Sequence, residues 1–194
     1  MNDSREFDPL QSGKYEPLSP EVIALFVKTN APPRLKAHLI LVHDVAFRLI
    51  EKLGLSFPGL RIDKDAVLFG AATHDLGKVI YPEELSKPGK QHEARGVELL
   101  EDLGVSGERA RFAYTHGNCN GSGLIRMEDL LVALSDHCWK GKRSTDLEDA
   151  IVAKLASDTG RESWECYAML DEIVQTLAAD ADTRLAWHGS FPVS

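Results

Sequence analysis

Apolar residues recur along most of the chain at intervals of three and four positions, which is the spacing of one face of an α-helix. The stretch 34–53 shows this spacing most fully, through residues such as Val42 and Leu49, and Gly54 is expected to end that helix. The same pattern predicts helices over 20–28, 66–73, 91–103, 108–116, 126–139, 146–157 and 162–179. Strict alternation of apolar and polar residues, the pattern of a half-buried strand, extends over no useful length. The chain is therefore expected to be all-α.

The domain organisation follows from the same pattern. Residues 1–18 are polar with scattered Pro and Gly, so we expect an arm that lies on the domain. At 194 residues the chain is long enough for one buried core, and 19–194 is expected to form a single all-helical domain. Within it, 34–143 carries the candidate chemistry, and 144–188 is expected to add C-terminal helices that cover the core or form a homodimer face.

The composition of the chain argues against some classes of binding partner and cellular location. A formal net charge of −8 argues against nucleic acid polymers and anionic membranes as main partners, but a local basic patch could still bind a small phosphorylated substrate. No run approaches the roughly 18 to 20 apolar residues of a membrane span, and the N-terminal residues lack the apolar core of a signal peptide. Cys119, Cys138 and Cys166 are widely spaced and form no CxxC pair. We therefore expect a cytoplasmic protein without a disulfide framework.

The pair His74-Asp75 ends the apolar, small-residue run in AVLFGAATHDLGK. Buried polar side chains need a partner or a metal ion, and further His and Asp residues stand beside other helical patterns. The predicted metal ligands are His38, His74, Asp75, His92, His116 and Asp136. Histidine nitrogen with carboxylate oxygen suits Fe, Mn, Zn, Ni or Co. Six such residues exceed the needs of one tetrahedral ion, so two divalent transition-metal ions are expected, with Asp75 as the bridge.

Two metal ions a few Å apart can polarise a phosphoryl oxygen and supply a hydroxide nucleophile, so the ligand set favours hydrolysis of a phosphate ester or anhydride. Asp75 and Lys78 are the predicted catalytic residues, with Lys78 offsetting charge on the phosphate oxygens. Lys78, Lys140 and Arg143 are candidate substrate-binding residues because they are cations close in sequence to the predicted ligands. For Arg143 a solvated helix end is an equal alternative.

The order and local context of these residues resemble the HD superfamily of metal-dependent phosphohydrolases, over roughly residues 35–143. THDLGK resembles the family's His-Asp doublet, HEARGVELLEDLGV its third element and AYTHGN its fourth. The resemblance implies an HD helical bundle, a nucleotide-type substrate and, through His92 and His116, a binuclear site. The branch we expect is that of the small bacterial hydrolases that split diadenosine tetraphosphate symmetrically.

Two histidines compete for the position of the first ligand. His38 and His43 are five residues apart, which places them about 140° apart around a helix. Counting from His38 gives the packed face that the family shows, whereas counting from His43 places Glu51 on it. We therefore predict His38 as the ligand. His43 could instead contact the substrate, form a hydrogen bond with a metal ligand, or lie on the helix surface.

The sequence is compatible with several alternatives. The chain could be a non-catalytic, metal-containing HD module that binds a nucleotide or a partner, or an HD-like diiron oxygenase. Glu93 could line the site or be solvated, and the loop 118–123 could approach a ligand or form a plain turn. His188 is expected to be structural or exposed.

Overall fold

The computed structural model describes residues 8–118 and 125–193, and this part of the chain is helical with no β-strand. The α-helices are α1 (Pro20–Lys28), α2 (Pro33–Ser56), α3 (Lys64–Thr73), α4 (Gln91–Asp102), α5 (Gly107–Ala110), α6 (Phe112–Thr115), α7 (Met127–Cys138), α8 (Thr145–Thr159), α9 (Ser163–Ala178) and α10 (Ala181–Gly189). The short 3-10 helices are η1 (Pro9–Gln11), η2 (Leu76–Val79) and η3 (Pro82–Leu85). The all-α prediction is confirmed.

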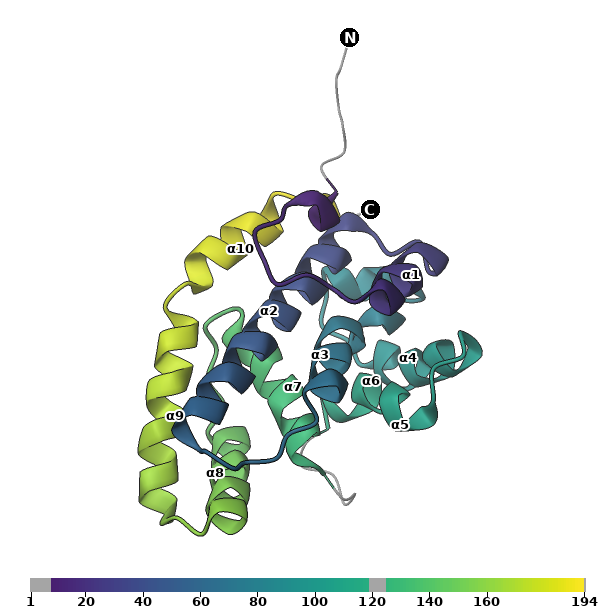
Figure 1. Ribbon diagram of the computed structural model, residues 1–194. Coiled ribbons are helices and arrows are strands. Elements are labelled where there is room, and N and C mark those ends of the chain that lie inside the picture. The colour runs from purple at the N-terminus through teal and green to yellow at the C-terminus, as the bar shows by residue number, and fades with distance from the viewer. Residues whose placement is uncertain (1–7, 119–124, 194) are drawn as a thin grey trace.

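Helix α2 is the centre of the bundle. It packs against α3, α7, α9 and α10, which lie around it in Figure 1. A helix that is covered on several sides buries side chains around much of its circumference, and the consecutive residues Leu39, Ile40, Leu41 and Val42 of α2 are all buried.

The core consists of two hydrophobic clusters that share α2 and α3. The larger one joins the second half of α2 to α7, α8 and α9 through residues such as Leu131. The other joins α1 and the start of α2 to α4 and α5 through residues such as Phe26. Helix α3 supplies Ala71 to the first cluster and Ala72 to the second. The residues that follow α3 therefore lie where both halves of the core support them.

Most helix boundaries lie within two residues of the prediction, and two larger differences stand out. Helix α2 continues through Gly54 to Ser56, since a single Gly is tolerated in a helix interior. The predicted helix over 108–116 is broken into α5 and α6 at Arg111. At the break the Arg111 guanidinium donates a hydrogen bond to the main-chain oxygen of Glu108.

Helix α10 lies beyond the last helix that the hydrophobic pattern predicted, and a buried arginine anchors it. Arg184 donates hydrogen bonds to the carbonyl oxygens of Trp139, Cys138 and Leu177, at 2.8, 3.0 and 2.6 Å. These carbonyl groups belong to the last turns of α7 and α9, where main-chain acceptors lack partners within the helix. Helix α10 is thereby held beside α2, at the end of the molecule where α2 begins (Figure 1).

Residues 8–18 lie on the bundle. The Glu16 amide donates to Asp44 Oδ1 at 3.0 Å, and the Tyr15 ring packs edge-on against Trp187 with centroids 4.6 Å apart. Cys138 and Cys166 are buried free thiols, while Cys119 and most of the loop 118–123 lie outside the described residues. No helix in the described ranges is long and apolar enough to cross a bilayer.

Candidate metal centre

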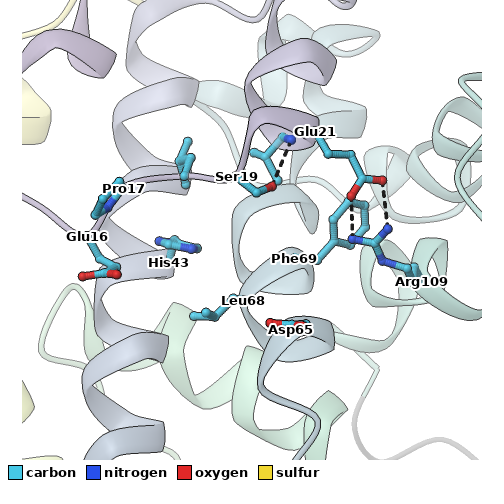
Figure 2. Close-up of a pocket in the computed structure, with 11 residues that line it drawn as sticks. Glu16, Pro17, Ser19, Glu21, His43, Asp65, Leu68, Phe69 and Arg109 are labelled. Carbon is cyan, nitrogen blue, oxygen red and sulfur yellow. Dashed lines mark hydrogen bonds and ion pairs between the residues drawn. The ribbon is translucent and has the colours of Figure 1, made fainter.

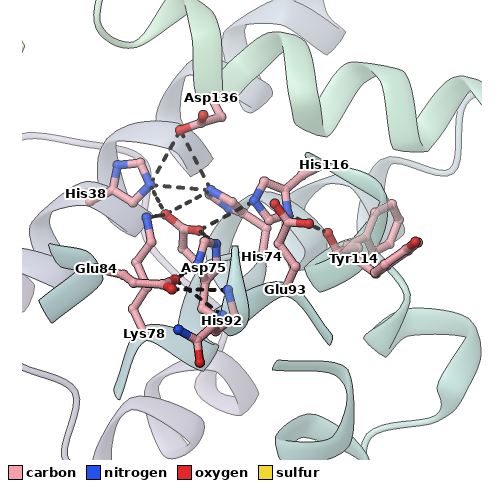
Figure 3. Close-up of polar contacts among 12 residues, drawn as sticks. His38, His74, Asp75, Lys78, Glu84, His92, Glu93, Tyr114, His116 and Asp136 are labelled. Atoms are coloured by element: carbon pink, nitrogen blue, oxygen red, sulfur yellow. Dashed lines mark hydrogen bonds and ion pairs between the residues drawn. The ribbon is translucent and has the colours of Figure 1, made fainter. Parts of the chain in front are cut away.

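Six predicted ligands, which come from five separate parts of the chain, meet at one point between α2, α3, α4 and α7 (Figure 3). Their positions are His38 in α2, His74 and Asp75 directly after α3, His92 in α4, His116 directly after α6 and Asp136 in α7. The apolar body of α3 is buried, so the two residues that follow it are delivered into the interior, where they are 0% and 3% exposed.

The two oxygens of the Asp75 carboxylate face different histidines. Asp75 Oδ2 lies 3.0 Å from His38 Nε2 and 3.7 Å from His74 Nε2. Asp75 Oδ1 lies 3.0 Å from His92 Nε2 and 3.5 Å from His116 Nε2. A carboxylate with one oxygen toward each pair of nitrogens has the arrangement needed to bridge two cations.

Asp136 completes the first group of ligand atoms. Its Oδ1 lies 3.5 Å from His38 Nε2 and 3.7 Å from His74 Nε2, and the two Nε2 atoms lie 3.3 Å from each other. The carboxylate is oriented by Trp139, whose Nε1 donates to Oδ1 at 3.2 Å, and by Lys140, whose Nζ lies 3.0 Å from Oδ2.

Three of the histidines are held through Nδ1. The Nδ1 atoms of His74 and His116 lie 3.0 and 3.1 Å from main-chain carbonyl oxygens one turn earlier in the chain. His92 Nδ1 lies 2.5 Å from Glu84 Oε2. In each case the oxygen can only accept, so Nδ1 carries the hydrogen and Nε2 presents a lone pair to the cluster. Histidine ligands of metal ions are held in this way.

The contact between His92 and Asp75 tests whether the cluster fits a metal ion. His92 Nε2 is buried and has no hydrogen-bond partner, although Asp75 Oδ1 lies 3.0 Å away. With Nδ1 donating to Glu84, both facing atoms are acceptors, and two buried acceptors at this distance need a cation or a proton between them. The residues therefore fit a metal ion. Three overlapping groups have ligand atoms within 4.8 Å of one another: His38, His74 and Asp136; His74, Asp75 and His116; His92, Glu93 and His116.

Comparison with known proteins identifies the family. The sequence model described as HD domain matches residues 35–156, which include all six residues of the cluster. The chain belongs to the HD domain family. HD domains bind divalent metal ions, in agreement with the clustered His and Asp side chains.

The chain is also similar to a multifunctional CCA protein of Verminephrobacter eiseniae (strain EF01-2), with 31% identity over 195 residues. The matched region covers 91% of this chain and 43% of that relative, so the chain spans less than half of the relative's length. No solved structure matches the chain.

The carboxylates of this HD domain are held in the ionised form. Burial would raise the pKa of Asp75, but its interactions with His74, Lys78, His38 and His92 hold it well below its ordinary value. Burial acts on Asp136 in the same direction, but the interactions with His74, His38 and Lys140 outweigh it, so the pKa of Asp136 is also lowered well below its ordinary value. Ionised carboxylates are the forms that bind metal ions.

The histidines divide by their surroundings. Burial lowers the pKa of His38 and lowers that of His116 to about 4, which keeps both rings neutral near pH 7. For His92 burial acts in the same direction, but the carboxylates of Asp75 and Glu84 raise its pKa above the ordinary value. The surroundings of His92 thus favour a positive charge at its ring, whether a proton or a metal ion.

Two buried acidic residues lie beside the cluster. The sequence did not indicate Glu84, and it left open whether Glu93 lines the site or is solvated. Glu84 lies in η3, is 7% exposed, and accepts hydrogen bonds from the amides of Gln91 and His92 at 3.1 and 3.3 Å, besides its contact with His92 Nδ1. Glu93 is 6% exposed and accepts from Asn118 Nδ2 at 2.6 Å. The sequence signal for Glu84 is the stretch 82–85, which begins with Pro and indicates a short turn of helix just before the predicted helix that carries His92.

The cluster opens into a cavity of about 230 Å³. Besides five of the six predicted ligands, its walls include Arg34, Lys78, Trp139, Lys140 and His188. Lys78 Nζ lies 2.5 Å from Asp75 Oδ2, so this lysine is at the cluster itself. His188, which had been expected to be structural or exposed, lines this cavity because α10 folds back onto α2.

Two predicted substrate-binding residues are not brought to this cavity. Arg143 forms ion pairs with Glu148 and Asp171, so its charge is used to join α8 and α9 to the end of α7. His43 is buried on another side of α2 and lines a separate cavity of about 430 Å³, shown in Figure 2 with Glu16 and Arg109. Five residues of separation turn His43 away from His38, which is the rotation expected for an α-helix.

Proposed function

We propose that this protein is a metal-dependent phosphohydrolase that cleaves a phosphate ester or anhydride of a nucleotide-type substrate. The observation that carries the proposal is the position of Asp75, whose two carboxylate oxygens each face a different pair of histidine nitrogens. Membership of the HD domain family and a small cavity with cationic walls support it. Paired metal ions recur in enzymes that hydrolyse phosphate bonds.

The ligands are assigned to two ions. His38, His74, Asp75 and Asp136 would hold one, and Asp75, His92 and His116 would hold the other. When bound, such ions polarise a phosphoryl oxygen and lower the pKa of water to near neutrality.

The surrounding side chains bind and orient. Lys78 Nζ, beside Asp75 Oδ2, would donate to the non-bridging oxygens of the phosphate that is attacked and offset their charge. Lys140 lines the same cavity beyond Asp136 and would attract the anionic substrate. Trp139 and Glu84 hold Asp136 and His92 in position through hydrogen bonds.

The substrate is proposed to be a nucleotide. Two likenesses support this: the similarity to a multifunctional CCA protein, and the resemblance of the motifs to the diadenosine tetraphosphate hydrolases. The net charge of −8 favours a small substrate over a nucleic acid polymer.

The first test is the metal content per chain of protein purified without chelator, measured by elemental mass spectrometry. We expect about two transition-metal ions per chain. About one ion would make His92 and His116 substrate contacts instead of ligands. No ion, even after reconstitution with Mn or Fe, would favour a module that binds without catalysis.

The second test is phosphate release from a panel of substrates: p-nitrophenyl phosphate, nucleoside mono-, di- and triphosphates, diadenosine tetraphosphate and an RNA oligonucleotide that contains CCA. His74→Ala should abolish activity while circular dichroism shows an intact fold. His43→Gln is the matched control, because it alters a buried histidine of the same bundle outside the cluster. A colourless, redox-silent enzyme that is active with Mn would exclude the diiron oxygenase. Activity retained by His74→Ala would overturn the proposal.

A further inference from the structure

The C-terminal segment after α10 is tied to the start of α2 through one residue, Arg34. The Arg34 amide donates to the Pro192 carbonyl at 3.1 Å, its Nε donates to the Phe191 carbonyl at 2.7 Å, and its Nη2 donates to the Gly189 carbonyl at 3.3 Å. These three bonds join parts of the chain more than 150 residues apart, and the C-terminal partners lie outside the region that matches the HD domain family. The position of Arg34, one residue before the matched region, is thus specified by the C-terminal segment.

The charge of Arg34 has no carboxylate partner within the described part of the chain. By contrast, Arg48, Arg109, Arg126 and Arg143 each pair with a carboxylate. The side-chain hydrogen bonds of Arg34 are made to neutral main-chain carbonyls, which fix the guanidinium without neutralising it. The guanidinium of Arg34 therefore keeps further N–H donors and its full positive charge, with which it can bind an anion.

Arg34 also lies beside the proposed reaction centre. It precedes His38 by four residues on the same helix, so both side chains project from one face, about 6 Å apart along the axis. Both residues line the cavity described above. Next to them stand His188 and Trp139, whose ring centroids are 5.1 Å apart, and Trp139 lies 5.1 Å from the His38 ring. The cavity therefore has a cationic and aromatic wall next to the ligand cluster.

We propose that Arg34 binds a second phosphate group of the substrate, one that is not attacked, and that residues 189–192 position it for this role. The inference rests on the proposed phosphohydrolase function and narrows its substrate class. The preferred substrates would be nucleotides with at least two linked phosphate groups. Lys78 and the ligand cluster would hold the phosphate that reacts, and Arg34 its neighbour.

The test compares kcat/KM for two substrates in the full-length, metal-loaded protein: p-nitrophenyl phosphate, with one phosphate group, and a nucleoside diphosphate. Arg34→Gln should lower kcat/KM for the diphosphate about 10- to 100-fold, the range for a lost hydrogen bond to a charged group, and change that for p-nitrophenyl phosphate less than about 3-fold. Arg34→Lys, which keeps the charge, should recover part of the lost activity toward the diphosphate. Arg48→Gln, an exposed and carboxylate-paired arginine of the same helix, is the matched control and should leave both values unchanged.

The outcomes separate this inference from the proposed function. If the wild-type protein hydrolyses neither substrate nor any other phosphate compound, the proposed function fails. If the wild-type protein is active but Arg34→Gln affects both substrates equally, Arg34 has only a structural role and the inference is wrong. It is also wrong if Arg34→Gln affects neither substrate, or if Arg34→Lys recovers nothing.

Discussion

Glu84 Oε2 lies 2.5 Å from His92 Nδ1, and both side chains are buried. The glutamate comes from η3 and the histidine from α4, so the contact fixes the start of α4 relative to the loop before it. Through it, the Nε2 atom of His92 is turned toward Asp75 Oδ1. The second group of proposed ligands therefore depends on a carboxylate that is not itself a ligand.

Glu84→Gln should lower metal affinity or activity about 10- to 100-fold, the usual effect of removing a hydrogen-bond partner from a ligating histidine. The amide keeps the size of the side chain but removes the charge. Metal titration and kcat/KM measure the effect. Glu83→Gln, at the adjacent exposed position, is the control and should change neither value. Equal behaviour of the two variants would show that the contact does not support the site.

Asp75→Asn should lower kcat more than about 100-fold and reduce the metal content, because an amide cannot supply two anionic oxygens to a bridged site. Because the folded protein holds the pKa of Asp75 below its ordinary value and pairs the carboxylate with Lys78, the variant is also expected to lose stability, so its fold has to be checked. Turnover, elemental analysis and circular dichroism together check this. Full metal content with unchanged turnover would rule out Asp75 as the bridge.

Gly77 should be intolerant of substitution. A Cβ atom there would collide with the main-chain oxygen of His92 and come within 2.8 Å of Gly96 Cα, so η2 and α4 would have to separate. Gly77→Ala is expected to destabilise the protein by about 1 to 3 kcal/mol and to lower activity as well. Denaturant unfolding and kcat/KM measure the two effects.

Gly54→Ala is the matched control for that substitution. Gly54 lies inside α2 with open space around its Cα, so alanine there should stabilise the protein by about 0.5 to 1 kcal/mol. A destabilised Gly54→Ala together with a neutral Gly77→Ala would contradict this account of the packing.

His43 should make stability depend on pH. Burial lowers its pKa to about 4, and Asp44 only partly offsets this. As pH falls below about 6.5 the unfolded chain takes up a proton that the folded protein does not accept until about pH 4, so stability is lost across this window and is constant above it. The share from His43 at pH 5 is about 2 kcal/mol.

His43→Gln should therefore reduce the loss of unfolding free energy between pH 7 and pH 5 relative to the wild-type protein. The other histidines are common to both proteins, so their contributions cancel in the comparison. Urea unfolding at a series of pH values measures it. Parallel pH profiles for the two proteins would show that His43 does not titrate as its burial implies.

The sequence by itself determined the helical class and the set of residues that meet at the cluster. Helical periodicity is a local property, encoded in neighbours three and four positions apart, so α2, α4 and α7 could be predicted from contiguous residues. His74 and Asp75 were recognisable because two polar side chains at the end of an apolar helix need a partner. Counting helical positions from His38 and from His43 also favoured His38, the one that lies in the cluster.

Only the tertiary structure decided which other side chains surround the cluster. Glu84 contacts His92 across a loop, and Arg34 donates hydrogen bonds to carbonyl groups near the C-terminus. Arg143 pairs with Asp171 and therefore does not line the cavity. No spacing rule links such residues, because their contacts depend on how α4, α9 and α10 pack against the core. The chain encodes the ligands locally, whereas the cavity around them results from long-range packing.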